Sequence, residues 1–149
     1  METIGTAESI LQTKSREVFA VPPETTVYEA IRQLSERNVG ALLVMEGSRL
    51  LGVFSERDYT RKIALQGRNS RETSVGEIVS CEIVSASPDS SISECMKLMT
   101  SNRVRHLPVM RGDRVVGVLS IGDLVNWIIR TQDATICSLE NYIAGGYPG

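Results

Sequence analysis

Residues 106–123 read HLPVMRGDRVVGVLSIGD, and residues 41–58 read ALLVMEGSRLLGVFSERD. The two stretches align without a gap at an offset of 65 residues, and the alignment extends over residues 18–63 and 83–128. Thirteen of these 46 aligned positions are identical, where unrelated sequences would give about three. The chain therefore contains one structural unit twice. We expect a pseudo-two-fold structure in which any binding site occurs twice.

Each unit has the pattern strand, helix, strand, turn, strand, helix. Thr26 and Glu29 have the spacing of a capping box at a helix start, and so do Ser91 and Glu94. Apolar residues follow at helical spacing. Short apolar runs at 41–45 and 106–110 predict buried strands, residues 50–55 and 115–120 predict return strands, and the next helices should begin near residues 56 and 121. The predicted fold class is α/β (α+β), with two tandem repeats.

The repeats divide the chain into four parts. Residues 1–65 form the first repeat with its lead-in, 66–74 (QGRNSRETS) a polar linker, 75–130 the second repeat, and 131–149 a C-terminal helix and tail. Short helices are predicted in both lead-ins, at 4–11 and 75–79.

Composition excludes several classes of protein. The chain has 149 residues, 42% hydrophobic and 23% charged, as in soluble globular proteins. A net charge of −2 gives no reason to expect nucleic-acid or membrane partners. No apolar run approaches the roughly 18 residues of a membrane span, and the first residues lack a secretory signal pattern. We therefore expect a cytoplasmic protein. Cys81, Cys95 and Cys137 have no metal-ligand or redox spacing and are interpreted as structural.

Both units end a strand with serine and place aspartate three residues later. These pairs are Ser55 with Asp58 and Ser120 with Asp123. A capping box explains the spacing without any ligand. The same geometry also suits a nucleotide, because free N–H groups and a hydroxyl bind phosphate and a carboxylate accepts hydrogen bonds from ribose hydroxyls. From these residues alone both interpretations remain open.

The chain resembles the CBS-domain family in its paired form, the Bateman module. The resemblance rests on the duplication, on the NRVRHLPV segment at 102–109, and on the strand ends GVFSERD (52–58) and GVLSIGD (117–123). It covers roughly residues 8 to 130. The chain most resembles stand-alone two-repeat proteins of this family, which share the ERDY, SIGD and C-terminal YIxGG patterns. The resemblance implies a β-α-β-β-α fold for each repeat, with the sheets packed together, and it favours ligand binding over a purely structural cap.

The resemblance also implies clefts between the repeats that bind adenosine compounds. AMP, ADP, ATP or NAD is expected as a regulatory ligand, S-adenosylmethionine less so, and no metal is required. The aspartates should hold the ribose, and the serines should contact ribose or phosphate. The first strand of each repeat should contact the adenine. Basic residues before the proline-containing strand should bind the phosphates. The predicted ligand-binding residues are Asp58, Asp123, Ser55, Ser120, Arg105, His106, Arg57, Val18, Val21, Ile83, Ala86 and Pro108.

The repeats differ where phosphate should lie. The second has Arg103, Arg105 and His106 where the first has Asn38, Gly40 and Ala41. Relatives often combine the aspartate of one repeat with the basic residues of the other, so the cleft at Asp58 should bind more tightly.

The same reasoning gives expectations for several neighbouring residues. His106 fits a phosphate contact or a structural histidine equally well. Arg61 and Lys62 are interpreted as a solvated helix face, and Tyr59, Leu124 and Trp127 as residues of a homodimer contact.

The expected function is regulatory. Adenosine nucleotides would change the shape or dimer packing of the module, and a separate effector protein would respond. The alternative is a dimeric scaffold that needs no ligand. An enzyme is not expected, because the chain has one histidine, no P-loop and no metal-ligand cluster.

Overall fold

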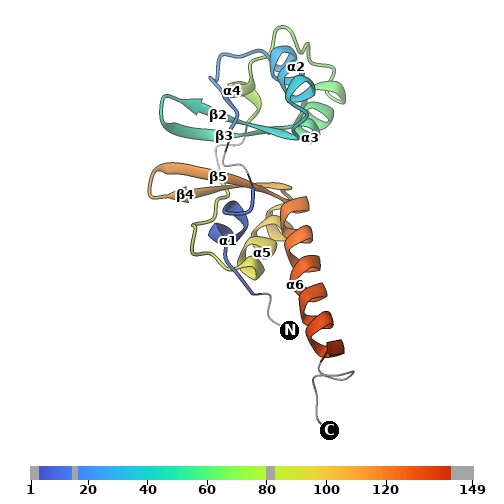
Figure 1. The fold of residues 1–149 in the computed structure, drawn as a ribbon. Coiled ribbons are helices and arrows are strands. Elements are labelled where there is room, and N and C mark those ends of the chain that lie inside the picture. Colours follow the sequence, from blue (N-terminus) through green and yellow to red (C-terminus); the bar gives the residue numbers. More distant parts are fainter. Residues whose placement is uncertain (1–3, 15–16, 80–82, 142–149) are drawn as a thin grey trace.

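Two lobes, each with a small sheet, make up the computed structural model, which describes residues 4–14, 17–79 and 83–141. The two sheets lie next to each other at the centre of the molecule, and the helices cover their outer sides (Figure 1). The upper lobe contains most of the first repeat and the lower lobe most of the second. This arrangement confirms the predicted mixed α/β fold with pseudo-two-fold symmetry.

In the upper lobe a three-stranded sheet has the order β1-β2-β3. Strand β1 runs parallel to β2, and β2 runs antiparallel to β3. The elements are β1 (Ala20–Val21), α2 (Val27–Arg37), β2 (Ala41–Glu46), β3 (Arg49–Ser55), α3 (Glu56–Asp58) and the π-helix η1 (Tyr59–Ala64).

The lower lobe repeats this order around the antiparallel hairpin of β4 and β5. Its elements are α5 (Ile92–Asn102), β4 (His106–Arg111), β5 (Arg114–Ser120) and α6 (Ile121–Asn141). A single parallel bridge between Ala86 and Val109 takes the place of β1. Both hairpins shift register at equivalent positions, between Val44 and Met45 and between Val109 and Met110. The duplication in the sequence is therefore a duplication in backbone geometry as well.

One predicted capping box is complete and the other is half formed. Ser91 and Glu94 form a full capping box. The Thr26 hydroxyl accepts a hydrogen bond from the Glu29 N–H at 3.1 Å, and the Glu29 carboxylate accepts from the Arg32 guanidinium at 2.8 Å. Helices α2 and α5 both end in a left-handed residue, Asn38 with φ 53° and Arg103 with φ 55°. Asparagine adopts this conformation readily, whereas arginine does so at a cost.

The helices after the return strands begin as predicted but then diverge. In the first repeat α3 continues as η1, so the backbone leaves regular α-helical geometry directly after Asp58. In the second repeat α6 continues without a break to Asn141, so the predicted C-terminal helix is an extension of α6. The rest of the predicted tail, residues 142–149, lies outside the described residues.

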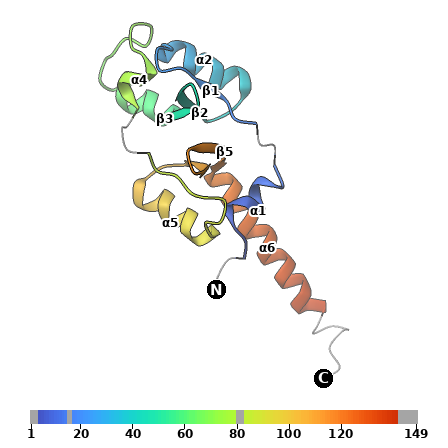
Figure 2. The ribbon, with the colours of Figure 1, turned by 90° about the vertical axis from the view of Figure 1, so that its left-hand side faces the viewer.

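The two lead-in helices pack crosswise. Helix α1 (Ala7–Leu11) belongs to the apolar core of the second repeat, whereas α4 (Val75–Ile78) belongs to the core of the first. The Ala7 N–H donates to the Ser90 carbonyl at 2.9 Å, and the Val75 N–H donates to the Thr25 carbonyl at 2.9 Å. Figure 2 shows α1 beside α5 and α6, and α4 beside α2. Each lobe is therefore completed by a segment that precedes the other repeat in sequence.

The predicted linker also packs on the first repeat. Its Ser70 and Thr73 carbonyls accept hydrogen bonds from the N–H groups of Tyr28 and Val27, at 2.9 and 2.8 Å. These bonds satisfy donors in the first turn of α2 that have no partner inside the helix. Residues 66–74 thus complete the upper lobe.

Candidate functional site

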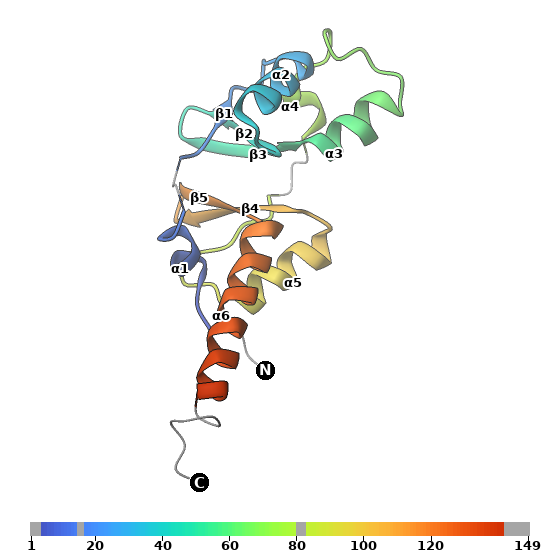
Figure 3. The ribbon, with the colours of Figure 1, turned by 45° about the vertical axis from the view of Figure 1, so that its right-hand side comes forward.

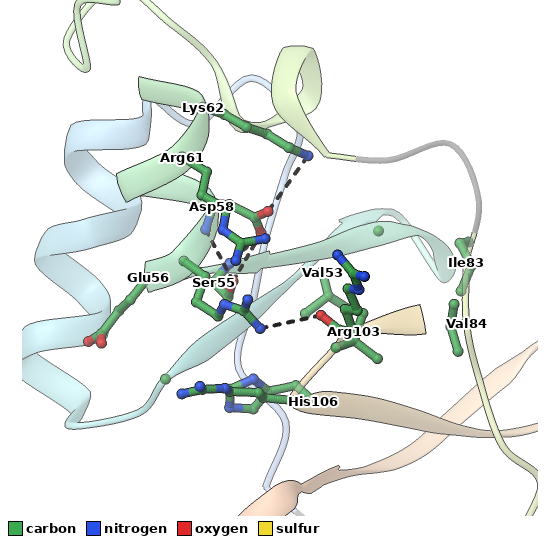
Figure 4. A pocket seen from close by; sticks show the side chains of 15 residues that line it. Val53, Ser55, Glu56, Asp58, Arg61, Lys62, Ile83, Val84, Arg103 and His106 are labelled. Atoms are coloured by element: carbon green, nitrogen blue, oxygen red, sulfur yellow. Dashed lines mark hydrogen bonds and ion pairs between the residues drawn. The ribbon is translucent and has the colours of Figure 1, made fainter. Parts of the chain in front are cut away.

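A cavity of about 260 Å³ lies between the two repeats on the side of Asp58. We call it the Asp58 cavity. Figure 3 shows α3 of the upper lobe and α5 of the lower lobe on this side of the molecule, and Figure 4 shows the lining side chains. The first repeat contributes Gly40, Gly52, Val53, Ser55, Glu56, Arg57, Asp58, Arg61 and Lys62, and the second contributes Ile83, Val84, Arg103, Val104, Arg105 and His106.

Asp58 uses one carboxylate oxygen for the helix cap. Its Oδ2 accepts hydrogen bonds from the Ser55 N–H at 2.9 Å and from the Ser55 hydroxyl at 3.1 Å. Its Oδ1 lies 3.6 Å from the Lys62 ammonium. The capping interpretation is therefore correct for the local structure. Capping leaves Oδ1 with a single long ionic contact and thus able to accept hydrogen bonds from a ligand.

Five cationic side chains line the Asp58 cavity. The first repeat contributes Arg57, Arg61 and Lys62, and the second contributes Arg103 and Arg105. Only two carboxylates, Glu56 and Asp58, are among the described lining residues. A concave surface with this excess of positive charge attracts anions. The repeats are also linked directly, because the Arg57 guanidinium donates to the Arg103 carbonyl at 3.4 Å (Figure 4).

The Asp58 cavity also has apolar lining residues. They are Ile83 and Val84 from the segment that precedes α5, together with Val53 of β3 and Val104. Figure 4 shows Ile83 and Val84 on the side of the cavity away from Glu56. Apolar and cationic side chains in one cavity suit a ligand that has both a flat ring and negative charge.

A second cavity, of about 330 Å³, lies at the pseudo-symmetric position. Its lining includes Val18, Phe19 and Leu43 from the first repeat and Val118 and Ser120 from the second. Asp123, the counterpart of Asp58, has its Oδ2 2.6 Å from the Lys14 ammonium. Lys14 lines this cavity, whereas Asp123 is not among its lining residues. The two clefts of the molecule are therefore chemically different.

His106 lies between the two cavities and lines both. Its ring packs closely on Gly40, since a β-carbon at Gly40 would lie 3.0 Å from Nε2. Burial lowers the pKa of His106 below its ordinary value of 6.5, and the nearby Asp123 carboxylate opposes this shift only in part. The imidazole is therefore neutral at pH 7. A phosphate that approached it would meet a hydrogen-bonding ring without a charge.

The structure brings half of the predicted binding residues into the Asp58 cavity: Asp58, Ser55, Arg57, Ile83, Arg105 and His106. Val18 and Ser120 line the second cavity. Among the remaining predictions, Asp123 is paired with Lys14. Val21 and Ala86 are buried in the two cores and line neither cavity, and Pro108 is buried in β4.

Sequence reasoning was wrong about Lys62 and Leu124. Lys62 is not a purely solvated side chain, because its ammonium donates to the Ile78 carbonyl at 2.7 Å, and both Lys62 and Arg61 line the Asp58 cavity. Leu124 is fully buried in the core of the second repeat and cannot form a dimer contact. Trp127 packs against Gly5 and donates its indole N–H to the Ile4 carbonyl at 2.7 Å.

Other chemistry finds little support in the described part of the chain. No group of three or more histidine, cysteine, aspartate or glutamate side chains there is arranged to hold a metal ion. Cys95 is buried in the core of the second repeat, and burial raises the pKa of its thiol to about 11. A thiol of this kind is unreactive at neutral pH. No helix among the described residues has the length and apolar character needed to cross a membrane.

Comparison with known proteins finds a sequence model described as the CBS domain, which matches residues 8–65 and 75–130. A mitochondrial CBS domain-containing protein of Arabidopsis thaliana, CBSX3, is 40% identical over 129 residues, which cover 83% of this chain and 63% of the relative. The chain thus spans less than two thirds of that relative's length. The CBS domain-containing protein YhcV of Bacillus subtilis is 34% identical, over 78% of this chain and 82% of its own length.

Solved structures agree with the sequence comparison. A protein with CBS domains from Burkholderia ambifaria, described as a candidate for signal transduction, superimposes with a TM-score of 0.82 at 43% identity. The match covers 86% of this chain and 96% of that protein. A CBS-domain-containing protein from Agrobacterium tumefaciens gives a TM-score of 0.77 at 33% identity, over 82% and 98% of the two chains.

Proposed function

The chain belongs to the CBS domain family, and from this premise we propose that it is a regulatory module that binds an adenosine nucleotide in the Asp58 cavity. Ligand binding would change the relative position of the two repeats, and a separate effector protein would respond to that change. The module is proposed to regulate rather than to catalyse.

The arrangement of charge in the Asp58 cavity carries this proposal. Asp58 offers its Oδ1 to ribose hydroxyls from one side of the cavity, and cationic side chains of both repeats lie around it. A carboxylate that can accept two hydrogen bonds is the usual partner of vicinal ribose hydroxyls, and guanidinium groups are the usual partners of phosphate. A capping role alone does not account for five cationic residues around one aspartate.

The same charges indicate which adenosine compound fits. ATP, ADP and NAD carry two or more phosphates and can use cations from both repeats, whereas AMP carries one. S-adenosylmethionine has no phosphate and carries a positive sulfonium, so it fits poorly beside five cationic side chains. We therefore propose a nucleotide with two or three phosphates as the preferred ligand.

Ligand binding can act as a signal because the Asp58 cavity spans both repeats. A ligand that binds one arrangement of the repeats more tightly than another shifts the population toward it. The Arg57 guanidinium donates to the Arg103 carbonyl across the boundary between repeats at this cavity, so a phosphate that draws on the Arg57 guanidinium would alter a link between the lobes.

We also propose that the module forms a homodimer. Val125 and Ile129 lie four residues apart on α6, and their side chains are 42% and 50% exposed. Apolar residues at this spacing form one stripe on a helix. Sedimentation of wild type and Ile129→Lys tests this contact, and a monomeric wild type would contradict it.

Thermal unfolding with a panel of compounds tests the proposed function. The panel is AMP, ADP, ATP, NAD and S-adenosylmethionine, with GTP and inorganic triphosphate as controls for the base and for charge alone. A ligand at a hundred times its dissociation constant should raise the midpoint by about 5–11 °C for a chain of this size. If no adenosine compound raises the midpoint of nucleotide-free protein, the alternative of a scaffold without a ligand is favoured.

A further inference from the structure

Lys14 makes a contact in the second cavity that has no counterpart at Asp58. It follows α1, which packs on the second repeat, and its ammonium lies 2.6 Å from Asp123 Oδ2 and donates to the Val118 carbonyl at 3.0 Å. The side chains of Lys14 and Asp123 are 34% and 23% exposed. The ammonium therefore neutralises the carboxylate at the position where a ribose would be held.

The duplication provides an internal comparison. The lead-in helix α4, the counterpart of α1, contributes no residue to the lining of the Asp58 cavity. The Lys62 ammonium lies 3.6 Å from Asp58 Oδ1 and is held more closely by the Ile78 carbonyl, at 2.7 Å. Asp123 is thus paired at 2.6 Å with a lysine of the lead-in, through the Oδ2 that also accepts from the Ser120 N–H, whereas the ion pair of Asp58 is longer, at 3.6 Å.

Cationic side chains are also distributed unequally. Lys14 is the only lysine or arginine among the described residues that line the second cavity, and it is already paired with Asp123. Two of its three N–H donors are already engaged, by Asp123 and by the Val118 carbonyl. A nucleotide in the second cavity would therefore find one partly engaged lysine and no other lysine or arginine among the described lining residues.

We propose that Lys14 blocks the ribose position at Asp123 and so makes the two clefts unequal, with one nucleotide bound per chain at concentrations that fill the Asp58 cavity. Lys14 is then a specificity-determining residue that selects between the clefts. This inference rests on the proposed function, because it takes an adenosine nucleotide as the ligand.

The test measures binding at the second cleft in a protein in which binding at the first has been weakened. In Asp58→Asn protein, binding of AMP is followed by NMR titration, which also shows that each variant is folded. Adding Lys14→Val, which removes the ammonium from Asp123, should tighten AMP binding by up to about fivefold, the range expected for a partly exposed ion pair. The loss of positive charge at Lys14 would weaken the attraction for the AMP phosphate. A gain in affinity would therefore come from the Asp123 carboxylate and not from the change in net charge.

Two further variants make the result specific. Lys14→Gln, which removes the charge but keeps a long polar side chain, should give a gain of the same sign. Adding Asp123→Asn to the Asp58→Asn and Lys14→Val protein should abolish the gain, because the newly available carboxylate is then lost.

The outcomes separate this inference from the proposed function. If AMP binds wild type through Asp58 but Lys14→Val leaves the second cleft unchanged or weaker, the inference is wrong and the proposed function stands. A weaker second cleft would mean that Lys14 contacts the phosphate. If AMP binds neither wild type nor any of the variants, both are contradicted.

Discussion

The guanidinium of Arg57 in the first repeat donates a hydrogen bond to the backbone carbonyl of Arg103 in the second, over 3.4 Å. Arg57 precedes Asp58 at the start of α3, and Arg103 ends α5 in a left-handed conformation with φ 55°. Both residues line the Asp58 cavity. The cavity therefore depends on a contact between residues that lie 46 positions apart in the chain, and it is complete only when both repeats are in place.

Replacing Arg103 with its counterpart from the first repeat tests its role in binding. Arg103→Asn removes one charged contact from the Asp58 cavity but supplies a residue that adopts φ > 0 more readily, as Asn38 does. ATP affinity should fall about tenfold, the lower end for a charged hydrogen bond, while the free energy of unfolding stays equal or rises. Calorimetric titration and urea unfolding measure the two quantities.

The matched control for Arg103 is Arg114→Asn, which removes the same charge at the exposed start of β5 outside both cavities. ATP affinity should then change little. An equal loss in both variants would mean that net charge, not a local contact, attracts the ligand.

Gly40 keeps the His106 ring in place between the cavities. A β-carbon at Gly40 would lie 3.0 Å from His106 Nε2 and 3.1 Å from Cε1, so the ring would have to move. Gly40→Ala should lower the free energy of unfolding by about 1 kcal/mol and weaken nucleotide binding. NMR of the imidazole reports the displacement. Unchanged imidazole shifts together with unchanged ATP affinity would contradict this account of the shared wall.

The crosswise position of α1 predicts coupling between Leu11 and Gly117. A β-carbon at Gly117 would lie 2.6 Å from Leu11 Cδ2, and Leu11 is buried. Gly117→Ala should destabilise the protein by about 1–3 kcal/mol, and part of this loss should be recovered when Leu11→Ala is present. Urea unfolding of the two single variants and the double variant gives the coupling energy.

Gly122→Ala is the matched control for this pair, because its β-carbon would meet only Ser120 Oγ, at 3.6 Å. This variant should be neutral or stabilising, since alanine favours a helix more than glycine does. If the effects of Gly117→Ala and Leu11→Ala simply add, α1 does not pack on β5.

Burial of His106 predicts a dependence of stability on pH. Because the pKa of His106 is lowered in the folded protein, the unfolded chain binds more protons once the pH falls below the ordinary value of 6.5. The free energy of unfolding should therefore be highest above that pH and should decrease as the pH falls toward the lowered pKa. Urea unfolding between pH 7.5 and about 5.5 measures the slope, and His106→Gln should reduce it. An equal slope in the variant would assign the dependence to other groups.

Much of the fold could be predicted because its signals are local. The strand, cap and turn positions follow from short patterns, such as Ser91 with Glu94 at a helix start or Gly47 and Gly112 at the two hairpin turns, where φ is 61° in both. The duplication doubled the number of these patterns and fixed the symmetry of the molecule.

Long-range contacts could not be predicted in the same way. The contact between Lys14 and Asp123 joins residues 109 positions apart. It exists because α1, which directly precedes the first repeat, packs on the second. The π-helix after Asp58 has no sequence pattern that distinguishes it from an α-helix. Helical spacing also cannot show that Leu124 faces the core of its own lobe rather than a partner.

The most direct test of the central claim compares two substitutions that have equivalent positions in the two repeats. Asp58 and Asp123 both cap the helix after a return strand by accepting from a serine N–H, at 2.9 and 2.8 Å. Asp58→Asn and Asp123→Asn should therefore have similar effects on folding. Calorimetric titration with ATP should show the tightest binding event weakened at least about tenfold in Asp58→Asn and unchanged in Asp123→Asn. Undiminished tight binding in Asp58→Asn would contradict the account.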